Sequence, residues 1–229
     1  MNNELATFLN EVESTNIIEI KPFELKRKLN KTSRVKPSIL HYSHLNMLTQ
    51  YAEVYNESKV ILTYEFNKDI KYFLTQPATF TIKVDDKKVS HTPDVVIIYT
   101  DGTVEFIQIK IDKKAKDKNY LKRFNQLAEF FKTELGVNYK LVTESSYNEG
   151  KYIENLQQLY AFLDVKLISD VTNNILAELP SVPTISVLEQ LCIKHEMTDV
   201  YAWALIAQGH FTYDSSKILT KKSAINLVH

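Results

Sequence analysis

The sequence predicts a mixed α/β fold followed by a small helical module, and three observations carry this prediction. An Asp-Gly pair at residues 101–102 separates two β-rich stretches, TPDVVIIY and TVEFIQIK, which is typical of an antiparallel hairpin. From Lys116 to Leu135 apolar residues recur every three or four positions, and Gly136 follows, as at the end of a helix. Beyond about Asp164 two more helical stretches are followed by a polar turn.

The segment before the hairpin predicts a strand, a helix and an extended run. MLTQYAEVY alternates like a strand, and Asn56 offers a helix cap before ESKVILTYEF. Within that helix Glu57, Ile61 and Tyr64 share one face, so we expect Glu57 in the first turn, pointing with the core-facing residues. KDIKYFLTQPATFTIKV then reads as one extended segment, and residues 85–88 form a polar turn before the first hairpin strand.

The segments after the hairpin predict a second domain. VNYKLVTES returns as a strand, and KYIENLQQLYAFL forms a helix. TISVLEQLCIKH and DVYAWALIAQG are helical, and Asp214-Ser215-Ser216 is expected to turn a short hairpin within HFTYDSSKIL. Helices followed by a small hairpin indicate a winged-helix-like module, so we expect domains at residues 1–165 and 166–229.

The composition is that of an ordinary globular protein. With 229 residues, 44% of them hydrophobic, the chain can bury a sizeable core. Lysine plus arginine (28) balance aspartate plus glutamate (28), so nucleic-acid binding needs a local basic face. The single cysteine, Cys192, excludes an intramolecular disulfide and is expected to be a small buried residue. The lack of a signal-like start or a long apolar run predicts a cytoplasmic protein with no membrane partner.

The hairpin register predicts a polar cluster at its open end, away from the turn. Side chains alternate across a strand, so Gln108 and Lys110 share one face of the second strand, and Asp94 shares a face with Val96 in the first. If the two faces coincide, we expect Asp94 to meet Lys110.

This cluster is suited to phosphodiester cleavage. Asp94, with Glu57 from the neighbouring helix, offers hard oxygen ligands, and Gln108 and Ile109 add an amide oxygen and a backbone carbonyl. Mg²⁺ prefers such an oxygen-rich, partly hydrated shell. Lys110 would then orient the attacking water or stabilise the developing charge.

These motifs resemble the PD-(D/E)xK restriction-like nucleases, and in particular the TnsA-like endonuclease subunits of heteromeric, target-selecting transposons. NESKVILTYEF, the Gln76-Pro77 pair and HTPDVVIIYTDGTVEFIQIK carry the resemblance, over roughly residues 50–145. It implies a restriction-endonuclease-like mixed sheet flanked by helices in residues 1–165, after an N-terminal arm. It also implies Glu57, Asp94 and Lys110 as catalytic triad, with Gln108 at the variable position.

The resemblance further implies a Mg²⁺-dependent DNA endonuclease, with Mn²⁺ able to substitute, that cuts the 5′ (non-transferred) strands at transposon ends. Its expected partners are double-stranded DNA, a TnsB-like DDE transposase, and a TnsC-like ATPase regulator that contacts the C-terminal domain. The expected location is the prokaryotic cytoplasm, associated with the nucleoid. Two alternatives stay open: an autonomous restriction-like nuclease of a phage or defence system, and an inactive DNA-binding scaffold, which Gln108 in place of an acid favours.

Several further residues carry secondary expectations. Glu53 competes with Glu57 as the helix acid, His91 is expected to be a hydrogen-bonded structural histidine, and Trp203 to lie in the core of the C-terminal module. The basic segment 21–37 reads as a surface arm. A second basic group follows the hairpin and is the predicted DNA-binding face: Lys113, Lys114, Lys116, Lys118, Lys122 and Arg123.

Overall fold

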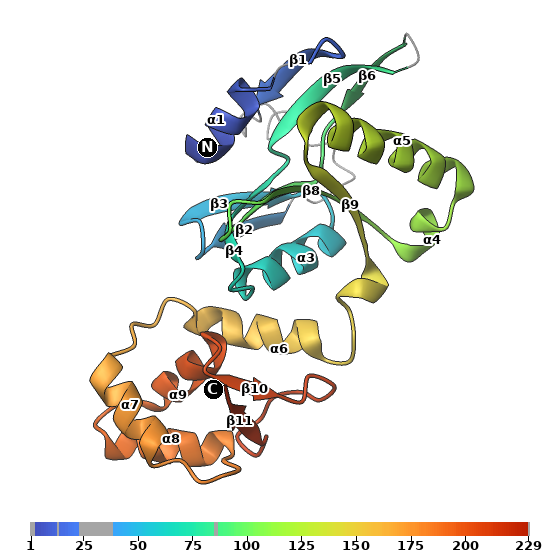
Figure 1. Cartoon of the computed structure of the whole chain (residues 1–229). Helices are drawn as coiled ribbons and strands as arrows, with labels where there is room; N and C mark the ends of the chain where they lie inside the picture. Colours follow the sequence, from blue (N-terminus) through green and yellow to red (C-terminus); the bar gives the residue numbers. More distant parts are fainter. Residues whose placement is uncertain (1–2, 13, 23–38, 85–86, 229) are drawn as a thin grey trace. The chain divides into compact units, whose positions relative to one another are not determined.

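The computed structural model describes residues 3–12, 14–22, 39–84 and 87–228 (Figure 1). The chain divides into two compact units, Met1–Ser146 and Tyr147–His229. This boundary lies earlier than the expected division at 165/166, because helix α6 (Tyr152–Leu159) packs with α9 (Asp199–Ala207) in the second unit. Residues 23–37 of the basic segment lie outside the described residues.

The first unit is built around a four-stranded mixed sheet. Its strands are, in spatial order, β4 (Ile70–Thr75), β7 (Val95–Tyr99), β8 (Val104–Lys110) and β9 (Asn138–Thr143). The β4–β7 and β7–β8 pairs are antiparallel, whereas the β8–β9 pair is parallel. A parallel pair needs a crossover, which α4 (Asp112–Ala115) and α5 (Lys118–Leu135) provide here. The mixed α/β class expected from the sequence is therefore confirmed for this unit.

The hairpin β7–β8 forms as the Asp-Gly pair predicts. Gly102 has a φ of +86°, a conformation that glycine adopts at little cost, and the Tyr99 N–H donates to the Thr103 carbonyl at 2.9 Å. In the register of the pair Val96 lies opposite Phe106. Most side chains of both strands are buried, because the sheet lies between other elements of the unit.

The second sheet contains the later part of KDIKYFLTQPATFTIKV, the segment that the sequence predicts to be continuously extended. It contains β1 (Ile17–Pro22), β5 (Ala78–Val84) and β6 (Lys87–His91), all antiparallel. The prediction of one extended run is wrong: Gln76, at a φ of +47°, breaks the chain between β4 and β5. The Gln76 N–H donates to the Asp94 carbonyl at 2.8 Å, so this break also fixes the start of β7.

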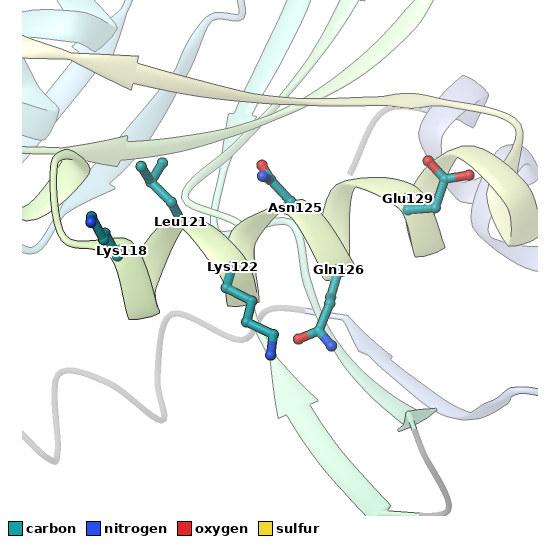
Figure 2. A pocket seen from close by; sticks show the side chains of 6 residues that line it. All are labelled: Lys118, Leu121, Lys122, Asn125, Gln126 and Glu129. Atoms are coloured by element: carbon teal, nitrogen blue, oxygen red, sulfur yellow. The ribbon is translucent and has the colours of Figure 1, made fainter.

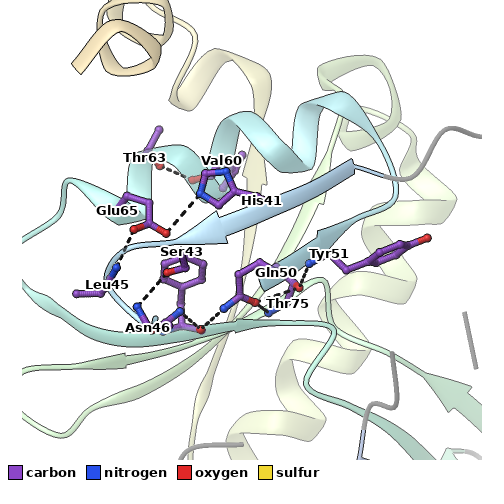
Figure 3. A network of polar contacts seen from close by, with 11 residues as sticks. His41, Ser43, Leu45, Asn46, Gln50, Tyr51, Val60, Thr63, Glu65 and Thr75 are labelled. Atoms are coloured by element: carbon purple, nitrogen blue, oxygen red, sulfur yellow. Dashed lines mark hydrogen bonds and ion pairs between the residues drawn. The ribbon is translucent and has the colours of Figure 1, made fainter. Parts of the chain in front are cut away.

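The β2–β3 hairpin is joined to the mixed sheet by side chains. It consists of β2 (Ile39–Ser43) and β3 (Leu48–Ala52), which confirms the strand expected in MLTQYAEVY. The buried Gln50 side-chain amide of β3 hydrogen-bonds to the backbone of β4, as a neighbouring strand would do. Its oxygen accepts from the Thr75 N–H at 3.0 Å, and its nitrogen donates to the Phe73 carbonyl at 3.1 Å. Figure 3 shows this network beside the contact between Glu65 Oε1 and His41 Nε2, which lie 3.4 Å apart.

Helix α3 (Tyr55–Glu65) follows β3, as expected, but its cap differs. Val54, and not Asn56, is the N-cap residue, and Asn56 lies inside the first turn. The Asn56 amide donates instead to Glu144 at 2.6 Å, in the short 3₁₀ helix η1 (Glu144–Ser146) that follows β9. The Asn56 side chain, which the sequence predicts to cap the helix, therefore hydrogen-bonds to a residue that is distant in sequence.

The core of the first unit is an aromatic cluster between the two sheets and α5. The ring of Phe131, on α5, lies 5.1 Å from that of Phe80 and 5.2 Å from that of Phe106, and it stacks on Tyr139 at 4.7 Å. Aromatic pairs at these distances stabilise a core beyond their buried area. Helix α1 (Asn3–Asn10) adds Leu5 and Leu9 to the same core. The predicted apolar face of α5 and its end at Gly136, where φ is +66°, are confirmed.

The second unit combines helices with a small antiparallel pair. After α6 and the 3₁₀ helix η2 (Tyr160–Phe162) come α7 (Ser169–Ala177), α8 (Ile185–Lys194), α9, β10 (Phe211–Tyr213) and β11 (Ile225–Leu227). The Asp214 carboxylate does accept from the Ser216 N–H at 3.0 Å. However, β10 pairs with β11, so the hairpin connection spans residues 214–224 and is longer than predicted.

Two side chains of this unit behave largely as expected. Cys192 is a free, fully buried thiol. Trp203 is half-buried and not fully enclosed: its ring lies 6.0 Å from that of Phe162, and its indole N–H donates to the buried Glu189 at 3.0 Å. The polar end of the ring therefore has a partner, as buried tryptophans usually do.

Candidate active site

The open end of the β7–β8 hairpin gathers polar groups around the Asp94 carboxylate. Its Oδ2 accepts from the Ile109 N–H at 2.7 Å, from Lys110 Nζ at 3.2 Å and from the Gln108 amide nitrogen. The Asp94 N–H donates to the Ile107 carbonyl at 3.0 Å, which extends the ladder by one residue. The predicted meeting of Asp94 and Lys110 is therefore present, because the strand register brings their faces together.

The Lys110 ammonium lies between two oxygens. It donates to the Ile109 carbonyl at 2.8 Å and to Asp94 at 3.2 Å. The side chain is 30% exposed, so the ammonium remains in contact with solvent. A cation in this place compensates part of the desolvation of Asp94, whose pKa is nevertheless raised, chiefly by burial.

Glu57 brings a second carboxylate to the same region from the first turn of α3. It is 8% exposed, and its Oε2 accepts from the Glu53 N–H at 2.6 Å. Burial, and then the charge of Asp94, raise the pKa of Glu57 to about 7. Glu53 itself lies in the bend before the helix and is half-buried. Of the two acids, Glu57 is the one that the helix buries beside Asp94.

Gln108 does not present its oxygen to this cluster, contrary to expectation. Its amide nitrogen faces Asp94, and its oxygen accepts from the Tyr139 hydroxyl at 2.7 Å. The cause is the parallel strand β9, which places Tyr139 beside Gln108. Residues 108 and 139 are far apart in sequence, so no local pattern could have indicated this partner.

His91 continues the same chain of hydrogen bonds. Its Nε2 lies 2.6 Å from the Tyr139 hydroxyl, and its ring meets Tyr139 edge to face. Burial, and then the charge of Lys110, lower the pKa of His91 to about 4, so the imidazole is neutral at neutral pH. The expected hydrogen-bonded histidine is confirmed.

Comparison with known families bears directly on this cluster. Residues 67–144 match the family model of the TnsA-like endonuclease N-terminal domain. This match supports assignment to the TnsA-like endonuclease family. In this segment the chain is similar to a nuclease domain of the transposase family. No curated protein matches the chain.

The matched TnsA-like segment contains three of the four clustered side chains, Asp94, Gln108 and Lys110. Glu57 precedes it on α3, so its membership of the site rests on its position in the structure. Within the described part of the chain, no helix is long and apolar enough to span a membrane.

The donor set at the open end of the hairpin fits a hydrated divalent cation. Among the described residues no group of three or more His, Cys, Asp or Glu side chains is placed to hold a metal ion. The cluster instead offers the buried carboxylate of Glu57, the half-buried carboxylate of Asp94 and the Ile109 carbonyl. Mg²⁺ commonly binds through one or two carboxylates and keeps several waters. Two carboxylates whose pKa values are raised by burial would also be stabilised in their charged form by such an ion.

The predicted basic face lies immediately after the site. Lys113 and Lys114 are in α4, Lys116 follows it, and Lys118, Lys122 and Arg123 are in α5; all six are exposed. Figure 2 shows Lys118 and Lys122 on α5 among the residues that line an open hollow, together with Leu121, Asn125, Gln126 and Glu129. The face is therefore accessible and begins within a few residues of Lys110.

The raised pKa of Glu57 predicts a pH-dependent stability. Because the folded-state pKa, about 7, exceeds the ordinary 4.5, the folded protein holds this proton more tightly than the unfolded chain. Stability should therefore fall as pH rises from about 4.5 to about 7. Glu57→Gln should be more stable than wild type at pH 8, by up to about 3 kcal/mol, and nearly equal to it at pH 4.5.

Thermal denaturation without divalent ions between pH 4.5 and 8 measures this difference. The pKa of Asp94 is also raised, so the stability of Glu57→Gln should still fall with rising pH, but with a smaller slope than that of wild type. Glu129→Gln, at an exposed position of α5, is the control and should follow wild type. Equal slopes for wild type and Glu57→Gln would show that the Glu57 carboxylate is not desolvated.

Proposed function

We propose that the chain is the Mg²⁺-dependent DNA endonuclease subunit of a cut-and-paste transposition complex, which cleaves the 5′ strands at transposon ends. The observation that carries this proposal is the contact between Asp94 and Lys110 at the open end of one hairpin, with the buried Glu57 of α3 near enough for the charge of Asp94 to raise its pKa. That hairpin lies within the segment that matches the TnsA-like endonucleases.

The residues have separable roles in this proposal. Glu57, Asp94 and the Ile109 carbonyl would hold the cation. When bound, Mg²⁺ neutralises charge on the phosphodiester and makes a bound water more acidic. Lys110, already 3.2 Å from Asp94, would orient the attacking water or stabilise charge that develops on the phosphate.

The proposed partners follow from the family. A TnsB-like DDE transposase would cut and join the 3′ ends, and would deliver the DNA ends to this subunit. The second unit, in which α6, α7, α8 and α9 precede the β10–β11 pair, supports a winged-helix-like module. By the family resemblance, this module would contact a TnsC-like ATPase. The isolated subunit should therefore be a poor nuclease.

Strand mapping tests this function. Labelled duplexes that carry a transposon end are incubated with the full chain and Mg²⁺, with and without the co-encoded transposase, and with EDTA as control. Cleavage of the 5′ strands only when the partner is present is the expected result. Cutting of plain DNA without any partner would favour an autonomous nuclease, and no cutting in any combination would favour an inactive scaffold.

The basic face should determine the salt dependence of DNA binding. Each phosphate contact contributes about 0.9 to the slope of log K against log salt concentration. Lys118→Ala combined with Lys122→Ala should therefore lower the slope by about 2, with little change in sequence preference. Fluorescence anisotropy over a range of salt concentrations measures the slope. Lys132→Ala, in the last turn of the same helix, is the matched control, and an equal slope in control and double variant would remove α5 from the DNA interface.

A further inference from the structure

Four side chains form a continuous hydrogen-bonded chain from the second sheet to the candidate site. His91, at the end of β6, lies 2.6 Å from the Tyr139 hydroxyl of β9. Tyr139 donates to the Gln108 amide oxygen at 2.7 Å, and the Gln108 amide nitrogen donates to Asp94. The proposed function uses only the last member of this chain as a cation ligand.

Each link has a direction that the others determine. An amide has one donating and one accepting end, whereas a hydroxyl and a neutral imidazole can each donate and accept. Because Tyr139 donates to Gln108, its oxygen is left to accept from the Nε2–H of His91. With this arrangement of protons, the hydrogen-bonded series ends at the Gln108 nitrogen, which is a donor. A donor is a suitable partner for the Asp94 carboxylate, but it cannot serve as a ligand for a cation.

We propose that Tyr139 and His91 are positioning residues that allow the Gln108 amide to turn over and present its oxygen when a cation binds at Asp94. After the turn the Gln108 nitrogen donates to Tyr139, and Tyr139 donates to Nε2 of His91. One proton leaves Nε2 and one enters Nδ1 through solvent, so the charge of the imidazole is unchanged. This inference rests on the proposed function, because it requires the cation.

Burial explains why the partner must be able to both donate and accept. Gln108 and Tyr139 are each 6% exposed, and the Phe131 ring stacks on Tyr139. An amide end left without a partner in such a place costs about 1–3 kcal/mol. Tyr139 satisfies whichever end of the amide faces it. The depressed pKa of His91, about 4, keeps the imidazole neutral, as both directions require.

The test follows the tautomer of His91 by ¹⁵N NMR of the full chain during titration with Mg²⁺, with His91→Gln used to assign the resonance. The Nε2–H tautomer is expected without Mg²⁺ and the Nδ1–H tautomer at saturation, with a matching shift of the Gln108 side-chain NH₂ signals. In Tyr139→Phe the tautomer should no longer respond, and Mg²⁺ affinity, measured by calorimetry, should fall about tenfold.

Gln108→Glu serves as the second variant in case Tyr139→Phe does not fold. A carboxylate accepts from Tyr139 whether or not the ion is bound, so His91 should stay in the Nε2–H form while Mg²⁺ still binds. Asp94-dependent binding with an unchanged His91 tautomer in wild type would overturn the positioning role and leave the proposed function intact. Absence of binding, or binding that Asp94→Asn does not weaken, would overturn both.

Discussion

Replacing Asp94 by asparagine should abolish DNA cleavage and leave the fold intact. The carboxylate is the acceptor on which Gln108, Ile109 and Lys110 converge, and its charge is what a cation at this site would require. Loss of that charge should reduce cleavage by at least about 100-fold, the scale of losing one essential electrostatic group. Since burial raises the pKa of Asp94, its charge opposes folding, and the variant should melt at the same or a higher temperature.

The matched control is Asp101→Asn, in the exposed turn of the same hairpin. Asp101 accepts from the Thr103 N–H at 2.8 Å, and an Asn-Gly turn favours the same hairpin, so this variant should keep both fold and activity. Strand-specific cleavage with the transposase present, together with circular dichroism melts, measures both variants. Unchanged 5′-strand cleavage by the assembly that contains Asp94→Asn would show that the cutting does not depend on this site, and would favour an inactive scaffold.

Lys110→Met should separate cation binding from catalysis. The ammonium lies 3.2 Å from Asp94 and would repel a cation there, so its removal should leave Mg²⁺ affinity unchanged or raise it. Cleavage should nevertheless fall by about 10²–10⁴-fold, because the group that orients water or stabilises the phosphate is gone. Asp94→Asn, by contrast, should lose both properties.

Calorimetry with Mg²⁺ and the cleavage assay, applied to the same preparations, distinguish the two variants. Lys113→Met, on the exposed surface of α4, removes an equal charge outside the site and should affect only DNA affinity. If Lys110→Met lost Mg²⁺ binding as well as cleavage, Lys110 would be needed to hold the site together and would have no separate catalytic role.

The parts of the site that could be predicted from sequence are those determined by local geometry. The Asp-Gly turn fixes the hairpin register, and the twofold alternation of strands then places Asp94 opposite the Gln108 and Lys110 end. Glu57 follows from the position of one helix, because a first-turn residue with a helical spacing to Ile61 must share its buried face.

The parts that could not be predicted depend on contacts between distant segments. The break at Gln76 divides one predicted extended segment into β4 and β5, which belong to different sheets. The position of this break is determined by the pairing of each strand with its own sheet. The orientation of Gln108 depends on Tyr139, which the β8–β9 pairing supplies, and the cap residue Asn56 is diverted to Glu144. Long-range partners override local preference in each case.

The most direct test of the central claim is anomalous diffraction from crystals of the full chain soaked in Mn²⁺. We expect a peak between the Asp94 and Glu57 carboxylates and beside the Ile109 carbonyl, present in wild type and absent in Asp94→Asn. A saturating soak that leaves these carboxylates without a peak would contradict the assignment of this cluster as a metal-dependent nuclease site.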